Sequence, residues 1–252
     1  LYLGPKTPHT TDYDKRFANA APLGFLGFVI CVMSFAVVLM GWGGAGPNMA
    51  AISGMFFFVG PVLLLLSLIG LWIQNQFFPM MVCGLFSVFW LSFGMLQLPT
   101  LQLQASYAPA ASPGSPPASL AELAAAGAAS KSYNAVIALY LTVWGFAIFT
   151  FWLFTLRINL VFAGIFALTS TGSFVMSGAY WKVSVGNYAA AQTLQTTAGA
   201  IFFVVALLGW YVLVVMMAAE MRVTISLPVG DLSHYWKRTD VELAVMEAEK
   251  KD

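Results

Sequence analysis

Residues 22–42 read PLGFLGFVICVMSFAVVLMGW and contain no charged side chain. A helix needs about 20 mainly apolar residues to cross a hydrocarbon layer about 30 Å thick, so this stretch is long enough to span a membrane. Five further stretches share its length and character: residues 49–73, 78–98, 133–156, 158–181 and 193–221. Charged residues are expensive at membrane depth, and among all six stretches only the last has one, Glu220, near its end. We therefore predict an all-α integral membrane protein with six transmembrane helices.

The composition excludes several classes of protein. The chain is 60% hydrophobic and 8% charged, whereas a soluble domain has about 25% charged residues. Its net charge of +1 leaves no basic stripe for a phosphate backbone, so no nucleic-acid partner is expected. Cys31 and Cys83 both lie in apolar stretches. We interpret them as small core hydrophobes rather than as a disulfide or a reactive thiol.

Residues 99–132 interrupt the apolar pattern between the third and fourth stretches. Their proline cluster at 109–117 is incompatible with a helix, while the alanine-rich run after it predicts a short surface helix over 119–129. We expect a long exposed loop here, within a six-helix membrane domain over residues 22–221.

Residues 1–21 and 222–252 are polar and are expected to be tails, the second of them partly helical over 240–250. An even number of spans puts both tails on one side, together with the second and fourth connections. That side holds nine Lys and Arg residues: Lys6, Lys15, Arg16, Arg157, Arg222, Lys237, Arg238, Lys250 and Lys251. The other side holds two, Lys131 and Lys182. Because cytoplasmic loops carry the excess of basic residues, we predict that both termini are cytoplasmic.

Catalytic groups are missing from the predicted spans. Intramembrane enzymes and proton relays place ionisable residues at depth, and the only histidines, His9 and His234, lie in the tails. We therefore expect no enzyme, no metal site and no cofactor. The classes that remain are a passive pore, a simple carrier and a structural subunit.

A row of hydroxyl groups is the most informative polar feature. Thr169, Ser173 and Ser177 follow one another at intervals of four residues, which places them on one face of a helix. Such a row can line a pore and offer hydrogen bonds to water or to an anion. Ser and Thr also join membrane helices to one another through interhelical hydrogen bonds. The sequence leaves both interpretations open.

The first span opens on Asn19-Ala-Ala-Pro-Leu-Gly24. This run resembles the Asn-Pro-Ala-Pro-Leu-Gly signature of the acetate uptake transporter family, which comprises YaaH-type bacterial succinate–acetate channels and fungal acetate and ammonia-export proteins. Asn19, Pro22, Leu23 and Gly24 match the signature. At a helix start, Asn19 can cap exposed amides, Pro22 fits the first turn, and Gly24 permits a close approach.

Three further motifs resemble the same family and occur in the family's order. They are LTVWGFAIFT at 141–150, TLRIN at 155–159 and LPVGDL at 227–232. The resemblance therefore covers residues 19–232 and marks the chain as a divergent member.

The resemblance implies a homohexamer in which each six-helix protomer holds its own pathway for small monocarboxylates. Family members narrow at a constriction of a Phe, a Tyr and a Leu. By position within the motifs, these fall on Phe28, Phe86 and Leu168, and an alignment shifted by one residue puts Leu85 in the place of Phe86.

Four positions depart from the family pattern. Ala20 replaces the first proline of the signature, and Phe86 replaces the constriction Tyr. Leu63 and Gly70 stand where the family has a Gln and a Glu. A ring of two Phe and one Leu can gate by dewetting, but it offers no hydroxyl to a carboxylate.

The function that the resemblance implies is a channel or transporter for acetate-like small monocarboxylates, surrounded by membrane lipid. Arg157, the only cation of the fourth connection, either attracts anions to the mouth of the pathway or serves as an orientation signal and headgroup anchor. The alternative is a structural or interaction subunit of a larger membrane complex with a degenerate pore. A third hypothesis is a sensor of acetate or ammonium.

Overall fold

Six long apolar helices make up most of the protein. The computed structural model describes residues 18–46, 48–110, 117–223 and 227–236. In these residues six helical segments are long and apolar enough to cross a membrane, which confirms the predicted fold class. They are α1 (Ala21–Leu39), α2 (Gly60–Ile73) with the helical turns before it, α3 (Phe77–Leu96), α5 (Lys131–Thr155), α6 (Leu160–Ser184) and α7 (Tyr188–Glu220). The helix predicted over 240–250 lies outside the described residues.

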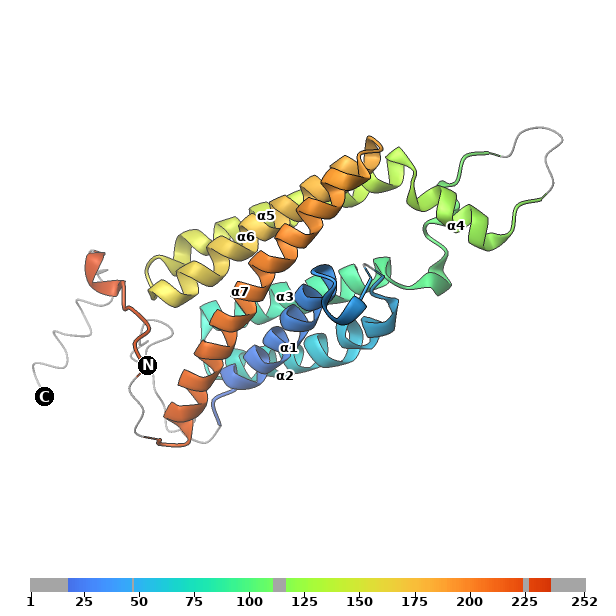
Figure 1. The fold of residues 1–252 in the computed structure, drawn as a ribbon. Coiled ribbons are helices and arrows are strands. Elements are labelled where there is room, and N and C mark those ends of the chain that lie inside the picture. Colours follow the sequence, from blue (N-terminus) through green and yellow to red (C-terminus); the bar gives the residue numbers. More distant parts are fainter. Residues whose placement is uncertain (1–17, 47, 111–116, 224–226, 237–252) are drawn as a thin grey trace, which may run out of the picture.

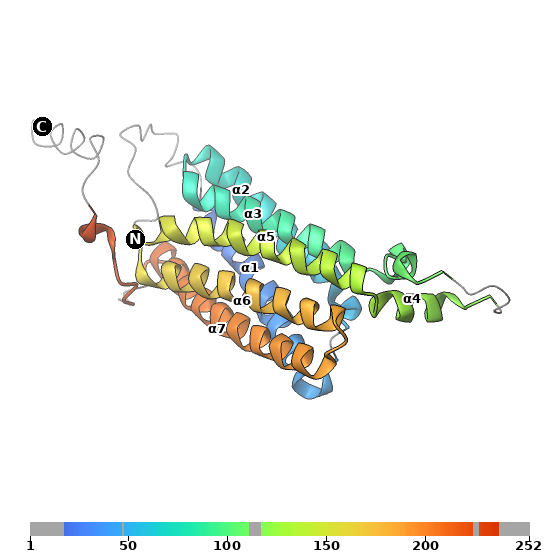
Figure 2. The same ribbon diagram turned by 90° about the horizontal axis from the view of Figure 1, so that it is seen from above.

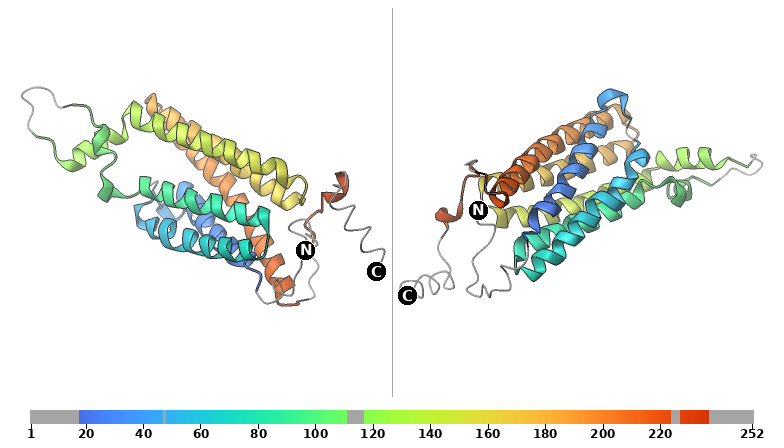
Figure 3. Two further views of the ribbon diagram at one scale, coloured as in Figure 1. Left: turned by 180° about the vertical axis from the view of Figure 1, so that it is seen from behind. Right: turned by 90° about the horizontal axis from the view of Figure 1, so that it is seen from below.

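The long helices form two groups of three, α1–α3 and α5–α7 (Figure 1). Neighbours within each group pack closely, and the groups meet where α1 packs along α7 (Figure 3). The backbones of α3 and α5 stand farther apart, and long side chains span the distance between them. Phe89 contacts Trp144 with ring centroids 5.2 Å apart, and the hydroxyls of Ser92 and Tyr140 lie 2.6 Å apart. Side chains, rather than backbone packing, therefore close the bundle between α3 and α5.

Helix α4 (Leu120–Ala128) lies in the long loop and projects beyond one end of the bundle (Figure 2). It is the short helix expected over 119–129. The Ser119 hydroxyl accepts a hydrogen bond from the Glu122 N–H, and the Glu122 carboxylate accepts one from the Ser119 N–H at 2.7 Å. This capping box starts the helix, and its hydrogen bonds hold the pKa of Glu122 below its usual range.

The two ends of the membrane domain meet at the opposite end of the bundle. Asn19 Nδ2 donates to the Glu220 carboxylate at 2.8 Å, which joins the start of α1 to the end of α7. We call this end the motif end, and the end that carries α4 the loop end. Helix α7 begins at Tyr188 rather than at residue 193, because the Asn187 side chain caps it by accepting from the Ala190 N–H.

Helix α2 is preceded by a wide turn. Residues Met55–Val59 form a π-helical turn, in which the Gly60 N–H donates to the Met55 carbonyl. Pro61 follows and has no N–H to donate, so a regular helical ladder cannot continue through it. The Cys31 thiol donates a second hydrogen bond to the Met55 carbonyl at 3.4 Å. Thus α1 helps to satisfy the irregular backbone of its neighbour.

Some polar side chains inside the bundle have a hydrogen-bond partner and others do not. The Ser67 hydroxyl donates to the Ala20 carbonyl at 2.8 Å and joins α2 to the start of α1. Within the described ranges, two buried side-chain polar atoms have no hydrogen-bond partner, Ser87 Oγ and Trp90 Nε1. A buried group without a partner has lost its hydration without compensation, so it does not stabilise the fold.

This difference predicts different effects on stability for two serine-to-alanine substitutions. Ser67→Ala removes an interhelical hydrogen bond and should lower the free energy of unfolding by about 0.6 to 1 kcal/mol. Ser87→Ala removes an unsatisfied hydroxyl and should leave stability unchanged or raise it. Unfolding in detergent micelles, followed by circular dichroism, measures both. A loss in Ser87→Ala as large as that in Ser67→Ala would contradict the assignment.

Candidate permeation site

The start of α1, at the signature, is hydrogen-bonded to two neighbouring helices. Asn19 Oδ1 accepts a hydrogen bond from the Ala21 N–H at 3.0 Å, while its amide nitrogen holds Glu220 of α7. The Gln74 side chain at the end of α2 donates to the Ala18 carbonyl. Pro22 lies in the first turn, where a missing N–H costs nothing. The signature therefore fixes where α1 begins.

Gly24, the last residue of the signature, lies where α1 packs against side chains of α2 and α3. A Cβ built on it would stand 2.6 Å from Ser67 Oγ and 2.8 Å from Cys83 Sγ. Leu23 points away and is 39% exposed. The glycine thus leaves room for the Ser67 and Cys83 side chains next to α1, beside the space described next.

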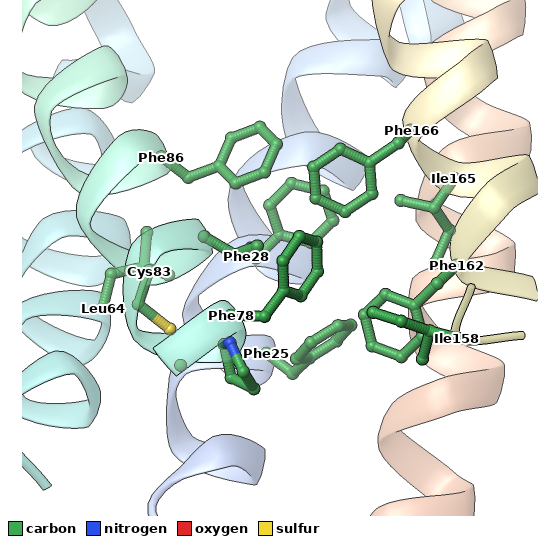
Figure 4. A pocket seen from close by; sticks show the side chains of 13 residues that line it. Phe25, Phe28, Leu64, Phe78, Cys83, Phe86, Ile158, Phe162, Ile165 and Phe166 are labelled. Atoms are coloured by element: carbon green, nitrogen blue, oxygen red, sulfur yellow. The ribbon is translucent and has the colours of Figure 1, made fainter. Parts of the chain in front are cut away.

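An aromatic cavity lies where α1, α2, α3 and α6 meet, toward the motif end (Figure 4). These four helices and the α5–α6 turn line it with Gly24, Phe25, Phe28, Leu64, Phe78, Pro79, Val82, Cys83, Phe86, Ile158, Phe162, Ile165 and Phe166. The cavity volume open to water is about 20 Å³, and one water needs about 10–15 Å³ of such volume. The cavity therefore holds about one water, and a molecule the size of acetate cannot enter unless the rings move.

Phenylalanine rings from three helices converge on this cavity. The Phe28 and Phe86 ring centroids are 4.7 Å apart, and those of Phe86 and Phe166 are 6.0 Å apart. Phe25 of α1 contacts Phe162 of α6 at 5.4 Å. Figure 4 shows these rings facing one another across the space between α3 and α6. These distances are typical of tilted and edge-to-face aromatic pairs, which hold the site closed without a polar bond.

The structure brings two of the three predicted constriction residues together. Phe28 and Phe86 touch and both line the cavity. Leu168 packs half-buried against the core but does not line the cavity, whose third ring is Phe166. Two residues along a helix correspond to about 200° of rotation, so Leu168 and Phe166 point in nearly opposite directions. Leu85, the alternative to Phe86, is half-buried and does not line the cavity either.

Among the described residues, no ionisable carboxyl, amine or imidazole group lines the cavity. Of the side chains named above as its lining, Cys83 alone carries a heteroatom, the Sγ, which lies 3.5 Å from Ser67 Oγ. Neither cysteine is in a disulfide, and both are buried. In the described part of the chain, no group of three His, Cys, Asp or Glu side chains is placed to hold a metal ion.

The three predicted pore hydroxyls are all buried and make different hydrogen bonds. Thr169 Oγ1 donates to the Ile165 carbonyl and Ser173 Oγ to the Thr169 carbonyl, both within α6. Ser177 Oγ donates to the Ala138 carbonyl of α5 at 2.7 Å, an interhelical bond. Thr169 lies one turn beyond the cavity-lining Ile165, on the same face of α6. The row therefore continues from the cavity toward the loop end, and its last member joins α6 to α5.

Arg157 lies in the turn between α5 and α6, next to the cavity-lining Ile158. Its side chain is half-buried, and its backbone N–H donates to the Phe154 carbonyl at 3.2 Å. The turn is thus at the motif end, beside the cavity but outside it.

Two of the departures from the family pattern pack against each other. The Ala20 Cβ lies 2.6 Å from where a Cβ on Gly70 would stand, so a Glu at position 70 could not coexist with this contact. Leu63 lies against Gly27 of α1, with its Cβ 2.8 Å from where a glycine Cβ would stand. These positions have become parts of a tight helix interface.

Several lining residues were not predicted from the sequence. Phe78, Val82 and Phe86 recur at intervals of four residues in α3, and Phe162 and Phe166 do so in α6. Such spacing puts side chains on one helix face, so two facing aromatic rows could have been proposed. The spacing does not predict, however, which faces of α3 and α6 point toward each other.

Fold and cavity together define a class: a six-helix membrane protein whose helices enclose a small aromatic cavity without catalytic groups. The chain belongs to the GPR1/FUN34/yaaH family, whose model matches residues 3–234. This confirms the resemblance read from the motifs. The protein is a multi-pass integral membrane protein and not an enzyme, in keeping with the transporters and channels that it resembles.

Individual relatives extend the comparison. The chain is 33% identical to the protein alcS of Aspergillus fumigatus over 239 residues, which is 94% of this chain and 84% of alcS. It is 25% identical to the acetate transporter protein patA of Penicillium expansum, over 89% of this chain and 82% of patA. The solved bacterial acetate channel SatP has a similar fold, with a TM-score of 0.59 and 19% identity over 85% of this chain and 99% of SatP.

The close approach at Gly24 can be tested with a matched pair of glycine variants. Gly24→Ala places a methyl group against Ser67 and Cys83 and should lower the free energy of unfolding by about 1–3 kcal/mol. Gly164→Ala on α6 meets only Leu208, at an ordinary 3.6 Å, and should be neutral or stabilising by up to about 1 kcal/mol. Unfolding in detergent compares them. Equal destabilisation of both variants would rule out the packing role of Gly24.

Proposed function

We propose that this protein carries acetate and similar small monocarboxylic acids across the membrane through the aromatic cavity of each protomer. The observation that carries the proposal is the meeting of Phe28, Phe86 and Phe166 from three helices in a cavity with no catalytic group. The names of patA and SatP as an acetate transporter and an acetate channel support the choice of substrate.

Opening of the cavity requires only that side chains move. Phe86 and Phe166 meet through ring contacts and not through hydrogen bonds, and the α3 and α6 backbones do not pack tightly here. A ring pair is worth about 0.5–1.5 kcal/mol beyond its buried area, so rotation of one ring is an inexpensive step. Between openings, the apolar rings exclude water and close the pathway by dewetting.

The lining favours the protonated acid over its anion. An ionised carboxylate without a hydrogen-bond donor or a cation is strongly disfavoured in apolar surroundings, whereas a neutral carboxylic acid loses far less. The acid then carries its proton with it. Beyond the rings, Thr169 and Ser173 continue the same face of α6 and supply hydroxyl oxygens toward the loop end.

The wider arrangement follows the family. The motif end, with both tails, faces the cytoplasm, and Arg157 there attracts carboxylate anions to the mouth. Six protomers assemble in the lipid into a homohexamer in which each protomer keeps its own pathway. The apolar side chains on the outside of the bundle, such as Leu66, Val143 and Phe146, face lipid or neighbouring protomers.

Uptake into liposomes tests the proposal. Purified protein should speed the entry of labelled acetate above that of protein-free liposomes, and a pH-sensitive dye inside should report acidification at the same rate. Phe166→Ala should raise the flux several-fold, because it removes one ring of the closed cavity. Leu168→Ala, whose side chain points away from the cavity, serves as the matched control and should stay within about twofold of the wild type.

Three outcomes would count against this account. Equal flux with and without the protein would exclude transport of the acid. A larger effect of Leu168→Ala than of Phe166→Ala would place the constriction at Leu168 and not at the aromatic cavity. Uptake without acidification would show that the anion is the species carried.

A second candidate function is favoured by the apolar lining itself. A lining without hydroxyl groups is also expected if the protein is a structural subunit of a larger membrane complex whose pore has degenerated. Migration on native gels separates the two: an isolated hexamer supports the transporter, and co-migration with a larger complex, together with no flux, supports the subunit.

A further inference from the structure

The segment after α7 lies against the turn that leads into α6. We call residues Pro228–Trp236 the strap, and it contains most of the fourth family motif. The Leu160 N–H donates to the Gly230 carbonyl at 2.7 Å, and the Leu232 N–H donates to the Ile158 carbonyl at 3.3 Å. These bonds form an antiparallel bridge between Asn159 and Asp231. The strap therefore pairs with the α5–α6 turn as a short strand would.

Two aromatic side chains fasten the ends of the strap. Tyr211 of α7 donates its hydroxyl to the Pro228 carbonyl at 2.6 Å. The Trp236 indole N–H donates to the Leu156 carbonyl, at the end of α5, at 2.9 Å. The strap thus reaches from α7 across the turn to α5 and holds three helices together at the motif end.

The shape of the strap leaves little room at its centre. Gly230 has a φ of +66°, and a Cβ built on it would lie 2.9 Å from the Leu160 Cβ. The next residue is held by a local turn, in which Asp231 Oδ1 accepts from the Ser233 N–H at 2.8 Å. That hydrogen bond keeps the pKa of Asp231 below its usual range, so the turn persists at neutral pH.

The strap completes the start of α6. The first N–H groups of a helix have no partner inside the helix. Here the Leu160 and Val161 N–H groups donate to strap carbonyls, and the Asn159 side chain accepts from the Phe162 N–H at 2.8 Å. Without the strap, two of these three donors would lose their partners. The first turn of α6 therefore depends on the strap for its position.

This turn also forms one wall of the aromatic cavity. Ile158, whose carbonyl the strap holds, lines the cavity, and so does Phe162 in the first turn of α6. Ile158 and Phe162 face Phe25 of α1 across the cavity (Figure 4). We propose that the strap positions Ile158 and Phe162 and thereby sets the width of the cavity at the motif end, which we call the mouth. Tyr211, Gly230 and Trp236 are the positioning residues that hold the strap. The transport consequence rests on the proposed function, but the geometry of the mouth does not.

Loosening the strap while keeping an aromatic ring at positions 211 and 236 tests this proposal. The double variant Tyr211→Phe with Trp236→Phe deletes two hydrogen bonds and should shift the balance between held and released strap roughly tenfold. Tyr235→Phe is the matched control, because Tyr235 lies in the same segment and is 76% exposed. Thermal unfolding of each variant confirms that it remains folded.

The first measurement does not need transport. The substitution Ile158→Cys is added to the wild type, the double variant and the control. The rate at which a water-soluble maleimide labels this cysteine measures how accessible the mouth is. The same proteins without Ile158→Cys give the background rate of the two buried native cysteines. Labelling should be about tenfold faster in the double variant than in the control. Equal rates would overturn the proposal.

The second measurement asks whether the mouth sets selectivity. In liposomes, the double variant should raise the flux of butyrate relative to acetate, while Tyr235→Phe should leave the ratio unchanged. An unchanged ratio in the double variant, with a transporting wild type, would overturn the role in selectivity. If the wild type carries no carboxylic acid but labelling is still faster in the double variant, the proposed function fails and the strap's control of the mouth stands.

Discussion

The close packing of α1 against its neighbours is the constraint on which the rest of the structure depends. Eleven of the 19 residues of α1 are buried, and the helix packs against α2 on one flank and α7 on the other. Gly24 lets α1 approach α2 and α3, and Gly209 of α7 lets Val29 approach in turn, 2.6 Å from where a Cβ would stand. Membrane helices associate through such contacts, because lipid provides no hydrophobic drive between them. With α1 fixed, α3 and α6 are left facing each other across a space that only side chains fill.

That space explains why the site is made of phenylalanine. Rings are large enough to bridge helices whose backbones do not touch, and they need no hydrogen-bond partner. Phe28, Phe86 and Phe166 close the cavity while leaving each helix's backbone bonds intact. The rings leave no hydrogen-bond donor for an anion, which is why we propose that the neutral acid is the species transported.

Much of the fold could be predicted from the sequence, and less of the site. Six apolar stretches of sufficient length predict six membrane helices, and the order of the motifs predicts the family. Phe28 and Phe86 were placed by motif position, whereas Phe166 was missed because spacing gives a helix face but not what that face meets. The positions of Leu168 and of the strap depend on helix rotation and on contacts between residues far apart in the chain. Such contacts leave no local pattern.

The most direct test of the central claim is a structure of the protein in lipid at saturating acetate, compared with one determined without it. The account predicts density for the acid among Phe28, Phe86 and Phe166, with the Phe28 and Phe86 ring centroids farther apart than the 4.7 Å of the closed cavity. Acid bound between protomers or along the lipid-facing surface, with these rings still in contact, would contradict it.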